Sequence, residues 1–415
     1  MTGVQTCALP ISFDTTIAAD PGWGLAKVTQ AVFILTLTEP NLLPQARQLL
    51  DDAEPLMAGA PAHERGHHAA ARAALDGRWR EACARWDALL VAQPRDLLAL
   101  TAAHLFDFYR GDARNLRARV ARVLPEWSVD DPLQPYVLGM HAFGLEECNL
   151  YPQAEQAGRE ALAANPRGPW AIHAVAHVME MQGRHGEGAA WLDTHRPEWA
   201  EDNGLAVHLW WHEALFALET LDTDAALALH DAHIAGANAV VNLQWLDAAA
   251  LLWRLQLLGV DVGPRWRALA NDWAEPVQHA GHYAFNDVHA LMALLGSDDL
   301  ARAQALVMAA NDRAQADNKA MAREVGLPLM RGLLAHACGD AAGACAALYP
   351  LRAAAHHFGG SHAQRDLIDQ TLLAAATSPG GEPALARALL NERRLAKPVT
   401  PLTQHWEQRL ARGRH

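Results

Sequence analysis

The sequence predicts an all-α protein built as a solenoid of antiparallel helix pairs. Alanine and leucine dominate its apolar residues, while valine and isoleucine are sparse, and this composition favours helices over strands. Apolar residues recur with helical periodicity in segments that short breaks of glycine, proline and aspartate separate. Two histidine pairs also repeat at an offset of 35 residues, which is the length of a two-helix repeat.

The periodic segments predict a succession of helices along the chain. Their expected ranges are 43–57, 62–76, 78–92, 96–110, 112–123, 133–148, 151–164, 168–182, 186–195, 203–220, 223–235, 240–259, 264–274, 283–295, 298–312, 318–338, 340–356, 362–376, 382–393 and 401–411. Four glycines follow a periodic run, where a left-handed residue commonly ends a helix: Gly77, Gly111, Gly183 and Gly339. Pro94 and Pro166 stand just before new helices, as in tetratricopeptide-like arrays.

Residues 13–415 are expected to form one tetratricopeptide-like α-solenoid domain, because no linker or low-complexity run divides them. The repeats are irregular in places, which allows the superhelix to close around a central pocket. Residues 1–12 (MTGVQTCALPIS) differ in composition from the rest and resemble a translated sequencing-adaptor tail. We expect this tail to be non-native and the natural first helix to be truncated.

The composition excludes several classes of function. A net charge of −13 argues against a nucleic-acid partner and against an anionic membrane surface. No uninterrupted apolar run is long enough to span a membrane, and the N-terminus lacks a basic signal region. The five cysteines show no CxxC pair and are typical of reduced thiols, so a cytoplasmic location is expected. Self-association stays open.

The strongest candidate site is a set of four histidines. His173 and His177 form one pair, and His208 and His212 form the other; each pair is spaced i, i+4 and therefore shares one helix face. Because the pairs are one repeat apart, they should lie on neighbouring helices, close enough to hold one divalent transition metal such as zinc or iron. The alternative is a set of core histidines that bond neighbouring polar groups.

Two acidic residues accompany the histidines. Glu180 follows His177 by three residues on the same face, and Asp247 lies 35 residues after His212. Either could serve as a ligand, as a support that orients a histidine, or as the proton acceptor of a catalytic reaction. Glu146, 34 residues before Glu180, and the adjacent Glu147 could supply extra carboxylates, but such a pair is more often solvated or capping, which is the interpretation adopted.

Further polar and aromatic residues are candidate ligand-binding positions. The same 35-residue offset leads from Asp247 to His282, with Asp287 and His289 close by; capping and packing explain these three equally well. The segment that begins at Ser361 predicts a capped helix start with an anion-friendly end, where His362 and Arg365 could clamp a carboxylate or phosphate, or could brace adjacent repeats. Aromatic and basic candidates complete the set: Trp211, which could wall an apolar pocket, and Arg254.

Six runs carry a resemblance to a known family. They are LGMHAFGLEE at 138–147, WAIHAVAHVMEMQGR at 170–184, VHLWWHEALF at 207–216, DAAALLWRL at 247–255, FNDVHA at 285–290 and GGSHAQRD at 359–366. From residue 13 onward the chain resembles the tetratricopeptide repeat protein 38 family, and only the N-terminus departs from it. The resemblance implies a tetratricopeptide solenoid and specifies no molecular activity.

Two functional hypotheses follow. In the first, the inner face holds a metal ion and a small polar molecule, as in a metal-dependent enzyme. In the second, the chain is a non-enzymatic adaptor that binds peptides or partner proteins in its concave groove. Peptide-binding solenoids usually present asparagine, lysine and arginine on their first helices, whereas this chain offers histidine, tryptophan and acidic residues. The first hypothesis therefore explains the residues expected on the concave face better than the second.

Overall fold

The computed structural model describes residues 13–201, 203–273, 275–397 and 399–412. Throughout these residues all regular secondary structure is helical, which confirms the predicted all-α class. No helix in them combines the length and the apolar character needed to cross a bilayer. The proposed adaptor-derived tail, residues 1–12, lies outside the described part.

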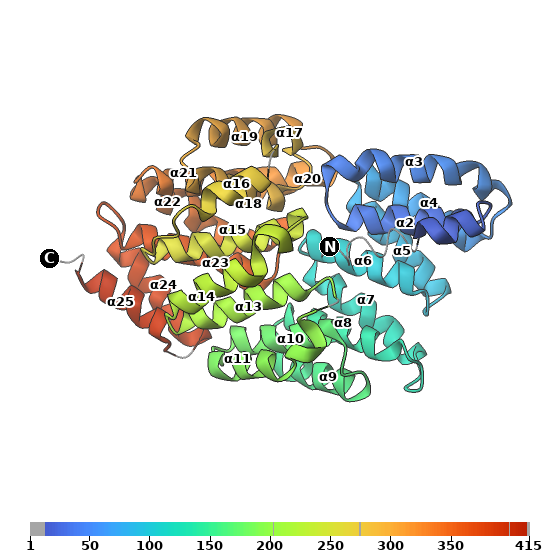
Figure 1. The fold of residues 1–415 in the computed structure, drawn as a ribbon, viewed down its shortest axis with the longest axis horizontal. Helices are drawn as coiled ribbons and strands as arrows, with labels where there is room; N and C mark the ends of the chain where they lie inside the picture. The colour runs from blue at the N-terminus through green and yellow to red at the C-terminus, as the bar shows by residue number, and fades with distance from the viewer. Residues whose placement is uncertain (1–12, 202, 274, 398, 413–415) are drawn as a thin grey trace.

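The chain winds as successive antiparallel helix pairs (Figure 1). The first half contains α2 (Gly24–Thr36), α3 (Leu43–Ala53), α4 (Ala62–Leu75), α5 (Trp79–Ala92), α6 (Leu97–Tyr109), α7 (Ala113–Val123), α8 (Gln134–Glu146), α9 (Tyr151–Ala164), α10 (Pro169–Met181), α11 (His185–Thr194) and α12 (Arg196–Trp199). The second half contains α13 (Ala206–Glu219), α14 (Thr223–Leu229), α15 (Asn242–Leu257), α16 (Arg265–Asp272), α17 (Pro276–His279), α18 (Ala284–Gly296), α19 (Leu300–Arg313), α20 (Ala316–Met321), α21 (Leu327–Ala337), α22 (Ala341–Leu348), α23 (His362–Ala376), α24 (Pro383–Ala396) and α25 (Pro401–Arg412).

Helix ends follow the local sequence signals. The four predicted glycine stops all have positive φ, between 64° and 79°, so their backbones adopt the left-handed conformation expected after a helix. Aspartate side chains cap the next helices by accepting a hydrogen bond from a backbone N–H of the first turn, as Asp96 does for α6 and Asp112 for α7. Alternating stops and caps therefore set the length of the repeats.

Prolines break three of the predicted helices. The helix expected over 43–57 ends as α3 at Ala53, and Pro55 lies in the 3-10 turns Glu54–Gly59 that follow. The helix expected over 318–338 contains a π-helical turn at Ala322–Gly326, followed by Pro328 in the first turn of α21. Proline lacks the N–H and crowds the preceding turn, so the regular ladder gives way there. The helix expected over 340–356 ends as α22 at Leu348, and Pro350 begins a run of 3-10 turns.

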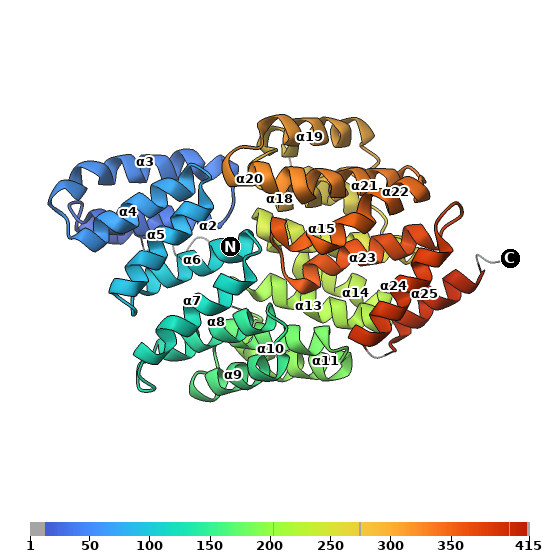
Figure 2. The ribbon, with the colours of Figure 1, turned by 180° about the vertical axis from the view of Figure 1, so that it is seen from behind.

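The N-terminal helices return to the middle of the chain and close the array. Figures 1 and 2 both place α3 and α4 next to α20, although about half of the sequence separates them. The Tyr283 hydroxyl donates to the carbonyl of Tyr109, 3.0 Å away, and the Tyr109 hydroxyl donates to the carbonyl of Thr36 at 2.7 Å. The side-chain amide of Asn242 donates to Glu39 at 2.9 Å. These buried bonds join α2, α6, α15 and α18 around a common interior.

Candidate metal centre

Neighbouring helices α10 and α13 bring the four histidines together. His173 and His177 lie one turn apart on α10, and His208 and His212 lie one turn apart on α13. One potential ligand atom from each ring lies within 4.8 Å of all the others. Ring centroids are 4.4 Å apart for His177 and His212 and 5.0 Å apart for His173 and His208. The juxtaposition predicted from the 35-residue offset is therefore confirmed.

Two of the four imidazoles are oriented by carboxylates. Nδ1 of His212 lies 3.0 Å from Oε2 of Glu180, and Nδ1 of His208 lies 2.9 Å from Oδ2 of Asp247. A carboxylate accepts from Nδ1–H, which leaves the lone pair of a neutral ring on Nε2. Metal-binding histidines are commonly held by a carboxylate in this way, because the bond fixes the tautomer and the ring direction.

The other two imidazoles have no hydrogen-bond partner. Both ring nitrogens of His173 and of His177, together with Nε2 of His212, are buried and unpartnered. Nδ1 of His177 is 3.6 Å from Oε2 of Glu146, which is too long for a hydrogen bond. An unmade buried hydrogen bond costs about 1–3 kcal/mol, so five such atoms in one cluster are expensive unless something binds them.

Electrostatics keep these rings neutral, as ligation requires. Burial, followed by the neighbouring imidazoles, lowers the pKa of His173, His177 and His212 well below the ordinary value of 6.5. Burial also raises the pKa of Glu180 to about 7 and that of Glu146 well above 4.5. A cation among them would favour both the neutral imidazoles and the ionised carboxylates, so the donor set fits a divalent metal.

Glu146 and Glu147 are buried, which corrects their interpretation as a solvated or capping pair. They are 0% and 6% exposed, and with His177 they form a second group of potential ligands. Glu146 is the last residue of α8, the helix one repeat before α10. Its 34-residue offset from Glu180 therefore places the two carboxylates at equivalent positions of successive repeats. The sequence placed these carboxylates correctly in register, but it did not predict their burial.

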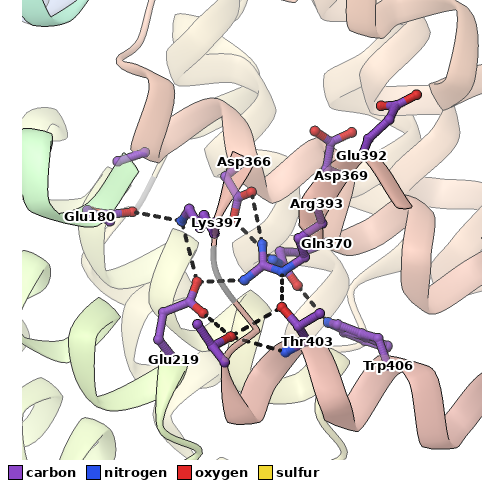
Figure 3. A network of polar contacts seen from close by, with 12 residues as sticks. Glu180, Glu219, Asp366, Asp369, Gln370, Glu392, Arg393, Lys397, Thr403 and Trp406 are labelled. Atoms are coloured by element: carbon purple, nitrogen blue, oxygen red, sulfur yellow. Dashed lines mark hydrogen bonds and ion pairs between the residues drawn. The ribbon is translucent and has the colours of Figure 1, made fainter. Parts of the chain in front are cut away.

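Behind the histidines, Glu180 belongs to a network of charges that ties the C-terminal helices to the site (Figure 3). Nζ of Lys397 lies 4.0 Å from Glu180 and 3.4 Å from Glu219 on α13. Arg393 of α24 pairs with the same Glu219 at 2.6 Å. Glu180 thus contacts His212 on one side and a buried cation on the other, and it acts as a support for the cluster.

An apolar cavity of about 270 Å³ opens beside the histidines. His173, His208 and Asp247 line it, so the cluster meets the cavity through these three side chains. Aromatic and aliphatic residues from α2, α6, α8, α10, α15 and α18 form most of the remaining wall: Phe33, Leu37, Leu105, Phe108, Phe143, Trp170, Leu246 and Phe285. The space next to the metal candidates is therefore more apolar than a pocket for a small polar molecule.

Trp211 and Arg254 contact the cluster from behind. The Trp211 indole stacks on His208, with centroids 5.2 Å apart and planes at 15°, and the guanidinium of Arg254 lies 5.5 Å from the indole. Trp211 is fully buried and is not part of the cavity wall, because His208 stands between them; Trp170 supplies the indole there instead. Arg254 donates to the carbonyl of Ala363, 2.8 Å away.

His282, Asp287 and His289 are not brought to the histidine cluster. His282 precedes α18 by two residues, because the short helix α17 is added between α16 and α18, and the 35-residue register fails here. His282 and Asp287 line a separate small cavity, where Asp287 accepts from the N–H of Gly281 at 3.1 Å. Nδ1 of His289 donates to the carbonyl of Phe285 at 2.8 Å. These bonds match the capping and packing alternative.

His362 and Arg365 are braced against Glu147. Arg365 donates to the Glu147 carboxylate at 3.0 Å and to Nδ1 of His362 at 3.1 Å, and the backbone N–H of His362 donates to Glu147 at 2.9 Å. Ser361 caps α23 in a reciprocal capping box with Gln364. These contacts join α23 to the end of α8, so this segment supports the site from the opposite wall.

The sequence did not reveal the cavity wall, since its residues come from helices far apart in the chain and each fits an ordinary apolar periodicity. Glu219, Arg393 and Lys397 also escaped notice, because isolated charges on periodic helices are typical of solvated faces. The 34- and 35-residue offsets were the one signal that reached the site. A comparison of the chain with models of known protein families finds no match.

Proposed function

We propose that this chain is a metal-binding helical-repeat protein, with a divalent transition metal held by His173, His177, His208 and His212, and that it acts as a metal-dependent enzyme on a small molecule in the adjoining cavity. The observation that supports it most is the cluster of five unpartnered imidazole nitrogens. We also propose membership of the tetratricopeptide repeat protein 38 family, on the six sequence runs and on the helical array.

The number of imidazoles bears on which metal serves. Four imidazoles would fill a tetrahedral zinc shell, which is the arrangement of structural zinc sites. An octahedral ion such as iron would retain two positions for water or substrate. His173 and His208 line the cavity, so open positions on that side would meet a ligand there. Iron therefore suits a catalytic role, and zinc suits a structural one.

Asp247 and Glu180 take different roles in this proposal. Asp247 lines the cavity and also holds His208, so it orients that ring and could accept a proton from a molecule bound in the cavity. Glu180 does not line this cavity and contacts His212 and Lys397. We assign it a positioning role, exerted through His212.

Elemental analysis of the purified protein tests the proposal directly. The wild type should carry close to one equivalent of iron or zinc, and the His208→Ala, His212→Ala double variant should lose it. The exposed vicinal pair His356→Ala, His357→Ala is the matched control and should keep full metal content. Retention of metal by the first variant, or its absence from wild type supplied with iron and zinc, would leave the peptide-binding adaptor as the better hypothesis.

A further inference from the structure

Away from the histidines, the side-chain oxygens that line the cavity are paired within the protein. The hydroxyls of Tyr109 and Tyr283 both donate to backbone carbonyls. Oε1 of Gln244 accepts from the N–H of Val240 at 2.8 Å, and Oε1 of Gln364 accepts from the N–H of Ser361 at 2.9 Å. Along most of this wall a ligand therefore meets few free side-chain acceptors, while the amide N–H groups of Gln244 and Gln364 remain as donors.

Free side-chain acceptors are concentrated at the histidine end of the cavity. His173 has two unpartnered ring nitrogens, while His208 and Asp247 lie next to it and bond each other through Nδ1 of the histidine. Among the described residues that line the cavity, none is a lysine or arginine, and Asp247 supplies the only carboxylate. This distribution disfavours an anionic ligand and confines its polar group to the histidine end.

The volume limits the size of the ligand. A cavity of about 150 Å³ lined by aliphatic and aromatic side chains can hold benzene, so 270 Å³ accommodates roughly ten to twelve non-hydrogen atoms. Phe33, Phe108, Phe143 and Trp170 contribute aromatic rings to the wall, which favours a flat aromatic body. Gly360 also lines the cavity, with φ of +76°, and a side chain there would collide with Phe285.

We propose that the cavity binds a neutral, mono- or bicyclic aromatic compound with a single oxygen-bearing group, such as a phenol, and that this oxygen faces His173 and His208. The apolar enclosure of the ring follows from the wall alone. Only the contact of the oxygen with a metal rests on the proposed function. In a metal-free protein the same oxygen would hydrogen-bond to His173.

Isothermal titration calorimetry with 2-naphthol, which has about eleven non-hydrogen atoms, tests this inference. Metal-loaded and chelator-treated protein should both bind it, and naphthalene-2-sulfonate should bind at least about tenfold more weakly because its charge is desolvated without a partner. Leu105→Trp and Leu205→Trp, which place an indole into the cavity from half-buried positions, should each weaken 2-naphthol binding by roughly tenfold or more.

The control is Leu300→Trp, at a position 43% exposed on α19, which should bind 2-naphthol like wild type. Thermal unfolding followed by circular dichroism checks that each variant is folded. Two substitutions that fill the cavity are used so that the test still stands if one of these variants does not fold. Protein that holds its metal but does not bind 2-naphthol, or binds it equally after both substitutions, overturns the inference. A wild type that takes up neither iron nor zinc when supplied with them, yet binds 2-naphthol and loses that binding on either substitution, instead overturns the proposed function alone.

Discussion

Two buried polar clusters lie close together in this protein and differ in how their atoms are paired. Around Glu219 every charge has a partner: Arg393 and Lys397 pair with one carboxylate oxygen, and the Thr400 hydroxyl donates to the other at 2.8 Å (Figure 3). In the histidine cluster around His177, five ring nitrogens have none. Burial is similar in both, so the difference is what a structural support around Glu219 and the proposed metal site at the histidines would each require.

The pKa values show the same contrast. Burial opposes ionisation of both Glu219 and Glu180, yet Lys397 and Arg393 lower the pKa of Glu219 to about 2. The pKa of Glu180 is raised to about 7 by burial, although Lys397 partly offsets it. One carboxylate is fully compensated by protein charges, whereas the other lacks a full countercharge in the protein alone. A metal bound by His212 would supply part of it.

The largest expected effect comes from breaking the paired cluster. Glu219→Gln leaves Arg393 and Lys397 buried without their carboxylate and should lower the free energy of unfolding by about 3–5 kcal/mol. Urea unfolding measures this, and the loss should be the same with and without chelator. Glu392→Ala, on a carboxylate 55% exposed and paired with Arg352, is the control and should cost under about 1 kcal/mol. An equal loss for the two variants would remove the distinction between the clusters.

The unpaired cluster should respond to metal instead. Free metal at about a thousandfold excess over its Kd should raise the free energy of unfolding by roughly 4 kcal/mol, because only the folded state assembles the four ligands. Thermal unfolding with iron or zinc, repeated after chelation at pH 7.5, measures the difference. His208→Ala, His212→Ala protein should show no such gain. A chelated wild type with an unchanged melting temperature contradicts the metal site.

A smaller effect is expected from pH in chelated protein. His212 has a lowered pKa in the folded state, so below about pH 6.5 the unfolded chain takes up a proton that the folded chain does not, and stability falls with acidification. Glu180, with its pKa raised from 4.5 to about 7, contributes in the opposite direction: its stabilisation is present at low pH and is lost as the pH rises toward 7.

The His212→Gln variant isolates the histidine contribution. From pH 6.5 to 5.5 its free energy of unfolding should fall less steeply than that of wild type, by up to about 1.4 kcal/mol per pH unit. Urea titrations at several pH values provide the two slopes. Parallel slopes would mean that His212 takes up a proton in the folded state, and that its neutral form is not enforced by burial.

The smallest effect concerns the supporting wall at α23. Ser361→Ala removes the N-cap hydroxyl of the capping box and should cost about 1 kcal/mol without any change in metal content. Differential scanning calorimetry and elemental analysis of the same sample provide both values. Loss of metal in this variant would show that Ser361 is needed to hold the metal site and does more than cap α23.

Local physics made much of this fold predictable. Glycine stops such as Gly111, aspartate caps and apolar periodicity act within one or two turns, and they set most helices well. Errors fall at Pro55, Pro328 and Pro350, where proline broke a run that was read as continuous, and helix α2 was not predicted. The four histidines were predictable because equivalent positions in successive repeats lie side by side in the folded array. His282 shows the limit, since the additional short helix α17 shifts the register.

Closure of the array has a consequence for how the protein unfolds. In an open solenoid each repeat contacts only its neighbours, so an end can fray while the rest persists. Here the bonds among Thr36, Tyr109 and Tyr283 and the pair Glu39–Asn242 connect the first described helices to the middle of the chain, and α2 and α18 supply opposite parts of one cavity wall. Loss of the N-terminal helices would therefore open the ligand cavity. Local fraying at that end and release of a bound molecule should be the same event, visible as slowed amide exchange in α2 when the cavity is filled.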